Sequence, residues 1–122
     1  MHKLTNAEFN EMMRQRTFQF ALKTLHFVDS RKEAIPRVIQ YQLSKSSTSV
    51  GSNFRAFCRG RSANERFAKI CIVVEEADET NYWLELIREG DYDTSMELEE
   101  LCAEVTEILK VTASIKHHYQ NT

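Results

Sequence analysis

Four carboxylates stand close together near the middle of this chain: Glu75, Glu76, Asp78 and Glu79. Carboxylates in a helical bundle can hold two metal ions when Glu-x-x-His pairs face them from neighbouring helices. The chain contains no Glu-x-x-His. We therefore predict no metal and no cofactor here, and we interpret the four residues as a solvated or hydrogen-bonded helix face.

A second polar stretch runs from Ser46 to Asn53 and reads SSTSVGSN. It looks superficially like a phosphate cradle, but it lacks the GxxxxGK[ST] spacing and no strand precedes it. The four histidines form no HExxH pair, and no Ser, Cys or Lys nucleophile has a base at a recognisable spacing. We predict no catalytic residue, no small-molecule substrate and hence no enzymatic activity.

Basic residues gather around a turn expected at residues 59–61. They are Lys45, Arg55, Arg59, Arg61, Arg66 and Lys69, with only Glu65 opposing them. Such clusters bind nucleic-acid phosphates, although the interleaved aromatic residues of single-strand platforms are missing. Two interpretations stay open: a solvated end of the fold that pairs with an acidic neighbouring subunit, or an RNA- or DNA-binding surface.

The charge is unevenly divided along the chain. Residues 1–74 carry 13 Lys and Arg against 5 Asp and Glu, a net charge of +8, whereas residues 75–122 carry 3 against 13, a net charge of −10. The two halves are expected to pair within the fold, to pair between subunits, or to present a basic face to an anionic partner.

Several classes of protein are excluded by composition. No run of 18 apolar residues could span a membrane, and the N-terminus lacks the apolar core of a secretory signal. Cys58, Cys71 and Cys102 have no CxxC spacing, which is typical of reduced, buried thiols. We expect a cytoplasmic protein.

The elements that position these residues are expected to be helices. Only 3 Gly and 1 Pro occur in 122 residues, which argues against a β fold. Periodicity and capping signals predict helices over residues 6–29, 36–59, 62–89 and 94 to the C-terminus, with capping boxes at Ser62-Glu65 and Thr94-Glu97. Short connections predict an all-α fold, an antiparallel up-down-up-down four-helix bundle, as a single domain over residues 1–122.

The second predicted helix contains the serine-rich run, which local propensity alone would assign to a loop. We attribute its small residues to close helix packing. We expect a helix-packing polar centre made of Ser46, Ser49, Asn53, Glu75, Glu76 and Glu79. Within it, Ser46 or Ser49 should bond a carboxylate of the third helix, and Asn53 should meet the first helix or a backbone carbonyl.

Two features exceed what one bundle can bury. The first helix has a stripe of Phe9, Met13, Phe20, Thr24 and Phe27 and a second stripe of Phe18, Ala21, Leu22, Leu25 and Val28. The adjacent Tyr82 and Trp83 cannot both face one core. We therefore predict self-association, with Tyr82 and Trp83 as candidate interface residues.

Residues 16–90 carry a resemblance to a known family. The matching residues are Gln42-Leu43, the run 46–53, Ala56, Ser62, Phe67, Lys69-Ile70, Glu75-Glu76-Ala77, Glu79-Thr80 and Tyr82-Trp83-Leu84. With these, the chain resembles the bacterial four-helix-bundle proteins encoded in intervening sequences of 23S rRNA genes. Departures are Arg55-Ala56, where the family usually has Glu-Ala, and Val73-Val74-Glu75 in place of a more lysine-containing run.

The resemblance implies a helical bundle that forms a ring-shaped homopentamer of unestablished biochemical role. A related group serves as accessory proteins to the reverse transcriptases of diversity-generating retroelements, where a basic surface binds nucleic acid. Two functions therefore stay open: a homo-oligomeric structural or interaction module, or a nucleic-acid-binding accessory protein.

Overall fold

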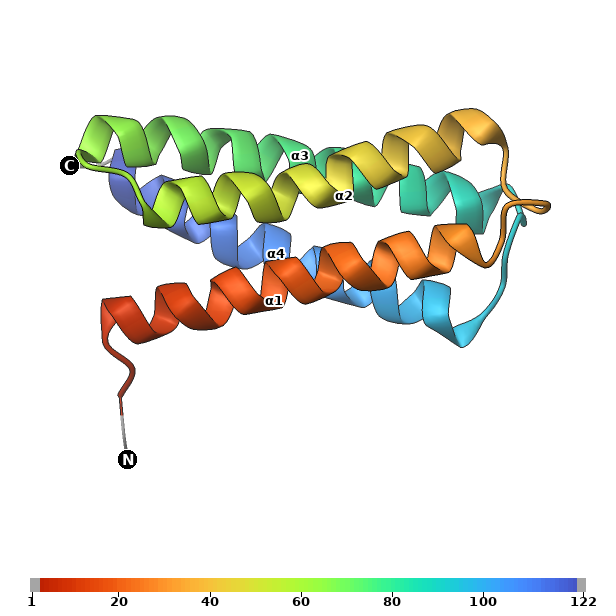
Figure 1. Ribbon diagram of the computed structural model, residues 1–122, viewed down its shortest axis with the longest axis horizontal. Helices are drawn as coiled ribbons and strands as arrows, with labels where there is room; N and C mark the ends of the chain where they lie inside the picture. Colours follow the sequence, from red (N-terminus) through yellow and green to blue (C-terminus); the bar gives the residue numbers. More distant parts are fainter. Residues whose placement is uncertain (1–2, 121–122) are drawn as a thin grey trace.

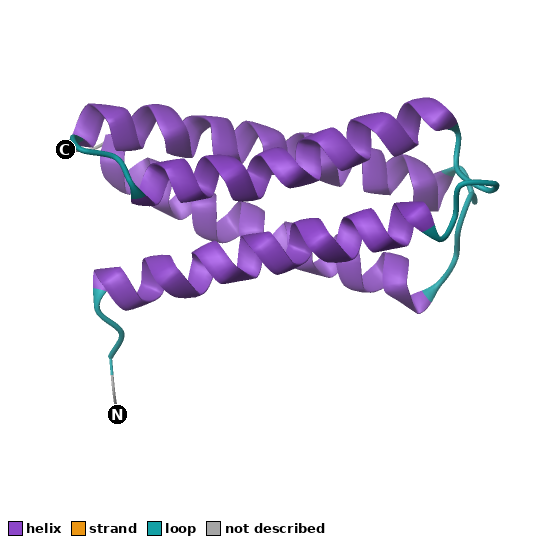
Figure 2. Ribbon diagram, in the orientation of Figure 1, coloured by secondary structure: helices purple, strands orange, loops and turns teal. Residues whose placement is uncertain are grey.

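The computed structural model describes residues 3–120, which form four helices and no strand (Figure 2). The helices are α1 (Asn6–Asp29), α2 (Arg37–Cys58), α3 (Ala63–Glu89) and α4 (Met96–Gln120). They run antiparallel to their chain neighbours (Figure 1), and this confirms the expected four-helix bundle. The start of α1, the α2–α3 turn and the end of α4 share one end of the bundle, here called the terminal end.

Helix starts follow local side-chain chemistry. The Thr5 hydroxyl accepts a hydrogen bond from the Glu8 amide, and Glu8 bonds back to the Thr5 amide, which completes a capping box. Ser62 caps α3 by accepting from the Glu65 amide. The predicted box at Thr94 was wrong, because Ser95 is the residue whose hydroxyl accepts from the Leu98 amide.

The core is one apolar cluster to which all four helices contribute. Its largest fully buried side chains include Phe20 and Phe27 of α1, Phe54 of α2, Leu84 of α3 and Ile108 of α4. Burying a side chain of this size stabilises the fold by about 1.5–3 kcal/mol. Buried hydroxyls are satisfied within their own helices: Thr24, for example, donates to the Phe20 carbonyl at 2.8 Å.

The serine-rich run is helical, as predicted, and it lies within α2. Ser46 and Ser47 are fully buried. A side chain added at Gly51 would place its Cβ 3.3 Å from the backbone oxygen of Thr17 on α1. Small residues therefore let α2 approach both α1 and α3, which supports the packing interpretation.

The four helix pairs are not equally well packed. α2 packs most extensively on α3, and α1 packs least on α4. At the other end of the bundle, Arg31 in the α1–α2 connection bonds Asp93 in the α3–α4 connection at 2.9 Å. It also bonds Glu97 in the first turn of α4 at 3.1 Å. The Arg31 guanidinium also lies 4.2 Å from the centroid of the Phe27 ring.

Candidate interaction surfaces

The polar centre of the α2–α3 contact is a pair of hydroxyls. The Thr80 hydroxyl lies 2.9 Å from the Ser46 hydroxyl and 2.8 Å from the Glu76 carbonyl, and both side chains are buried. The expected serine–carboxylate bond is therefore not formed by Ser46, whose partner on α3 is a threonine. A carboxylate would bring a charge that this contact could not solvate.

Asn53 bonds within its own helix. Its amide donates to the Ser49 carbonyl at 3.0 Å and to the Ser49 hydroxyl at 2.9 Å. Of the two partners expected for Asn53, the structure shows the backbone carbonyl and not α1. This carbonyl belongs to α2 itself. Ser49 is thereby occupied by Asn53, and no bond joins it to a carboxylate of α3 among the described residues.

The three predicted carboxylates of α3 occupy different environments. Glu75 is exposed, so it takes no part in helix packing, whereas Glu76 and Glu79 are half-buried. Burial raises the pKa of Glu76, and the neighbouring Glu79 charge raises it further, while Lys45 opposes the shift. Within residues 3–120 no group of three or more His, Cys, Asp or Glu is arranged to hold a metal ion.

The six basic residues do not form a single cluster. Lys45 lies in the middle of α2, 6.0 Å from the Tyr41 ring centroid, about 21 Å along the helix from Arg59. Arg55, Arg59 and Arg61 are exposed at or near the α2–α3 turn, and Arg66 and Lys69 are half-buried on α3. Only Arg61 has an ion-pair partner among the described residues: Glu65, at 3.8 Å.

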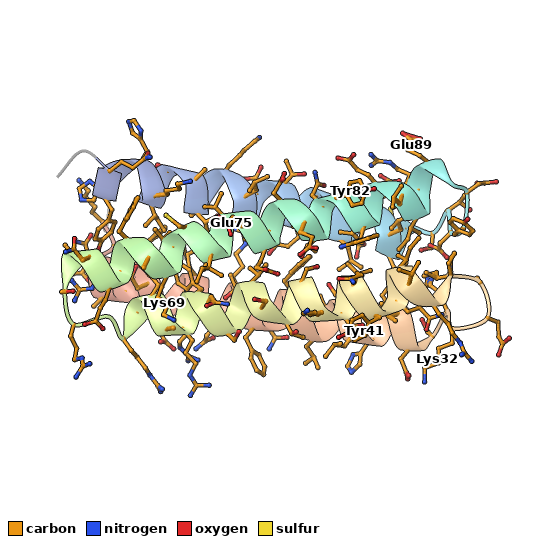
Figure 3. All side chains as sticks on the ribbon, turned by 90° about the horizontal axis from the view of Figure 1, so that it is seen from above. Lys32, Tyr41, Lys69, Glu75, Tyr82 and Glu89 are labelled. Carbon is orange, nitrogen blue, oxygen red and sulfur yellow. The ribbon has the colours of Figure 1, made fainter. Side chains whose placement is uncertain are left out.

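The two aromatic residues of α3 point in different directions, as their adjacency requires. Tyr82 is exposed on the outside of α3, in line with Glu75 and Glu89 (Figure 3). Trp83 packs against the core, and its indole N–H is buried without a hydrogen-bond partner within residues 3–120. Their rings lie 5.0 Å apart.

The second stripe of α1 is largely exposed. Phe18 is 57% exposed and Leu22 and Leu25 nearly 40%, whereas Val28 is buried. On α2, Val38 and Tyr41 are both more than 60% exposed, and a shallow groove connects Leu25 with Tyr41. We call Phe18, Leu22, Leu25, Val38 and Tyr41 the α1–α2 apolar face. The α2 members were not recognised as exposed from the sequence, because Val38 and Tyr41 follow the same helical spacing as buried residues of α2.

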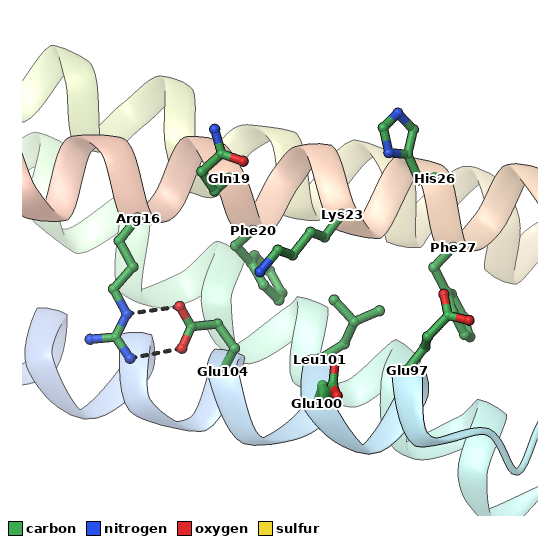
Figure 4. Close-up of a pocket in the computed structure, with 10 residues that line it drawn as sticks. All are labelled: Arg16, Gln19, Phe20, Lys23, His26, Phe27, Glu97, Glu100, Leu101 and Glu104. Atoms are coloured by element: carbon green, nitrogen blue, oxygen red, sulfur yellow. Dashed lines mark hydrogen bonds and ion pairs between the residues drawn. The ribbon is translucent and has the colours of Figure 1, made fainter.

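A cleft of about 620 Å³ separates α1 from α4 (Figure 4). Phe20, Phe27 and Leu101 line its floor, while Lys23 and carboxylates of α4 line its rim. Arg16 closes one side with two hydrogen bonds of 2.7 Å to Glu104. Sequence analysis missed this pair, since the two residues are 88 positions apart.

None of the helices in residues 3–120 has an apolar stretch long enough to cross a membrane. The model of the 23S rRNA-intervening sequence protein family matches residues 10–114. The chain belongs to this family. No curated protein matches it.

One solved structure is a protein of unknown function from the S23 ribosomal protein family of Bacteroides thetaiotaomicron. It is 31% identical to the chain, with a TM-score of 0.78, and the match covers 84% of this chain and 96% of that one. The fold of this intervening-sequence family protein is thus shared by that protein.

Proposed function

We propose that this protein is a non-enzymatic, cytoplasmic module that acts by assembling with copies of itself, as a ring of five. The observation that carries the proposal is the α1–α2 apolar face. Its five side chains are exposed on two neighbouring helices, and a groove joins Leu25 of α1 to Tyr41 of α2. Exposed apolar surface of this kind is typical of protein–protein contacts.

Charge supports a contact between unlike faces. α2 carries three basic residues and no acidic one, and Arg37 and Arg55 lie near its two ends. α3 carries seven acidic residues against three basic ones. Its outward residues Glu75, Asp78, Glu85 and Glu89 are all exposed, with Tyr82 among them.

Basic residues border the α1–α2 apolar face, with Arg55 beside Phe18 and Arg37 beside Tyr41. These arginines complement the acidic outer face of α3 on the next copy. Contacts between two different faces are heterologous, and they close into a ring when the rotation between copies permits it. Tyr82, exposed within the acidic face, supplies an aromatic anchor of the kind enriched in interfaces.

Light scattering on the purified protein tests the assembly. We expect a mass several times the chain mass of 14.3 kDa, and a shift to monomer in the Leu22→Asp/Leu25→Asp variant. The matched control is Met96→Asp/Ala103→Asp, which adds the same charge at exposed positions of α4. A wild-type monomer at micromolar concentration, or an unchanged mass in the α1 variant, would refute the proposal.

A second candidate function is RNA or DNA binding. Arg55, Arg59 and Lys69 lack ion-pair partners among the described residues, which leaves them available to phosphates. Because phosphate contacts release counterions, affinity should fall steeply with salt. We expect an Arg55→Gln/Arg59→Gln variant to bind single-stranded RNA more weakly with a shallower salt dependence. Undetectable binding by the wild-type protein at about 50 mM salt would exclude this function.

A further inference from the structure

A separate cavity of about 880 Å³ opens at the terminal end of the bundle. It lies between the first turns of α1, the end of α2, the start of α3 and the last turns of α4. Its volume is within the range of small-molecule sites, about 300–1,000 Å³. Two of its sides are α1 and α4, the helix pair that packs least.

The walls of this terminal cavity combine polar surface, to which Asn6, Asn10 and Ser114 contribute, with an apolar part. Phe57 is buried at its base and meets the Tyr119 ring edge-on at 5.7 Å between centroids. Phe9, Val111 and Ile115 pack against the core but keep part of their surface exposed in the cavity. These residues present aliphatic and aromatic surface to any molecule that enters.

The rim of the terminal cavity carries two cations, Arg66 and Lys110. The His118 imidazole lies on the same lining, and none of the lining residues is a carboxylate. This distinguishes it from the cleft of Figure 4, where three glutamates line the rim. Lys110 lies 3.8 Å from Glu107, but both are exposed, and such surface pairs are weak and screened by salt.

Arg66 is the decisive rim residue. Its side chain is half-buried, and no ion-pair partner for it lies within residues 3–120. Its aliphatic stem lies close to the α2–α3 turn, because a Cβ added at Gly60 would lie 2.6 Å from the Arg66 Cγ, and its guanidinium is therefore available to an anion. The guanidinium can form two parallel hydrogen bonds with a carboxylate or a phosphate.

We propose that the terminal cavity binds an amphipathic anion, an alkyl or aryl group carrying one carboxylate or phosphate head group. The apolar part lies against Phe9, Phe57 and Ile115, and the head group meets Arg66 and Lys110. Sequence analysis predicted no small-molecule ligand, because the lining residues come from four separate segments with no shared motif. The proposal is independent of self-assembly, since its residues are not those of the α1–α2 apolar face.

Titration calorimetry with decanoate, decyl phosphate and the neutral decanol tests the site below the micellar range. We expect one of the two anions, or both, to bind at least tenfold more tightly than decanol. The Arg66→Gln/Lys110→Gln variant should lose at least tenfold in anion affinity, while Arg66→Lys/Lys110→Arg should retain most of it. Ser114→Phe, at an exposed position of the rim, should block entry of the chain without changing charge.

The matched control is Lys23→Gln/Arg88→Gln, which removes one exposed lysine and one exposed arginine outside the terminal cavity and should bind like the wild type. Circular dichroism confirms that each variant is folded, and light scattering reports assembly separately. Equal affinity for anion and alcohol, equal loss in the control, or no binding by the wild-type protein would overturn the proposal. Binding of a short single-stranded RNA to this site in place of the alkyl anions would also overturn it.

Discussion

At the scale of single residues, two hydroxyls set the closest polar contact between α2 and α3. Ser46 and Thr80 are buried and lie 2.9 Å apart, and each also bonds its own helix. Leaving one buried polar group unpaired costs about 1–3 kcal/mol. The pair fixes the register of the two helices, because a shift of one residue would remove both partners from the contact.

We predict that Ser46→Ala and Thr80→Val are coupled. Each should destabilise the protein by about 1 kcal/mol, and the double variant should lose less than the sum by about 0.5–1 kcal/mol. Urea denaturation of the four proteins measures this. Ser49→Ala and Glu76→Ala serve as the comparison: no hydrogen bond joins these two side chains within residues 3–120, so their effects should add. Additive losses for Ser46 and Thr80 would show that the hydroxyls are not partners.

Glu76 is predicted to give a pH-dependent effect. Its pKa is raised in the folded protein, first by burial and then by the Glu79 charge. The protonated form therefore favours folding, so this contribution is full below the unfolded pKa, near 4.5, and is lost as pH rises through the folded value. Glu76→Gln should stabilise the protein by about 0.5 kcal/mol at pH 7 and by less at pH 4.

Thermal melts at both pH values check this prediction. Glu75→Gln is the matched control, since Glu75 is the adjacent residue but is exposed. It should change stability little at either pH. The same stabilisation from Glu75→Gln would point to the overall negative charge of α3, not to the half-buried site.

At the scale of elements, the contact between α1 and α2 depends on a missing side chain. Gly51 lowers helix propensity by about 1 kcal/mol relative to Ala. An added Cβ, however, would lie 3.3 Å from the Thr17 backbone oxygen and 3.5 Å from its carbonyl carbon. Backbone atoms of a packed helix move only if the two helices separate.

We expect Gly51→Ala to destabilise the protein by about 1 kcal/mol despite the better helix propensity, and Gly51→Val to do so by several kcal/mol. Ser52→Ala, the exposed neighbour on the same helix, should instead be neutral or slightly stabilising. Chemical denaturation gives all three values. A gain in stability for Gly51→Ala would mean that α1 and α2 adjust without cost.

The helices themselves could be predicted from the sequence, and the reason differs between them. α4 follows from its periodicity alone, whereas α2 required the argument that small residues serve packing. The Thr94 cap was assigned wrongly because Ser95 offers an equivalent hydroxyl one residue later. The local sequence pattern does not distinguish Thr94 from Ser95 as the cap of α4, because the choice depends on the backbone path of the α3–α4 connection.

The candidate surfaces could be predicted only in part. The second stripe of α1 could be recognised in the sequence, because a helix with one buried face needs only one apolar stripe and α1 has two. The terminal cavity and the Arg16–Glu104 pair were not visible, because they join residues from opposite ends of the chain. Lys45 was wrongly grouped with the α2–α3 turn because it is close in sequence. At 1.5 Å per residue, the intervening part of α2 places it about 21 Å from Arg59.

At the scale of the whole molecule, the division of charge between the two halves of the chain predicts a rescue experiment. Reversing charge on α2 with Arg37→Glu/Arg55→Glu should weaken assembly by opposing the acidic face of α3 on the next copy. Reversing α3 with Asp78→Lys/Glu85→Lys should weaken it equally. The combined variant should regain assembly, because the attraction is restored with opposite signs.

Sedimentation velocity at about 0.1 M salt distinguishes the three variants, since higher salt screens the interaction. Failure of the combined variant to recover, while each parent remains folded, would show that these two faces do not meet. Recovery would show that α2 of one copy meets α3 of the next, as the proposed assembly requires.

The loose packing of α1 on α4 has a consequence for how the molecule opens. A segment with fewer buried contacts unfolds locally at lower free energy than the rest of the protein. In monomeric variants, backbone amides of α1 should therefore exchange with solvent deuterium sooner than those of α2 and α3, which would remain a cooperative hairpin. The order of release would be α1 first, then α4, with the Ser46–Thr80 contact last to open.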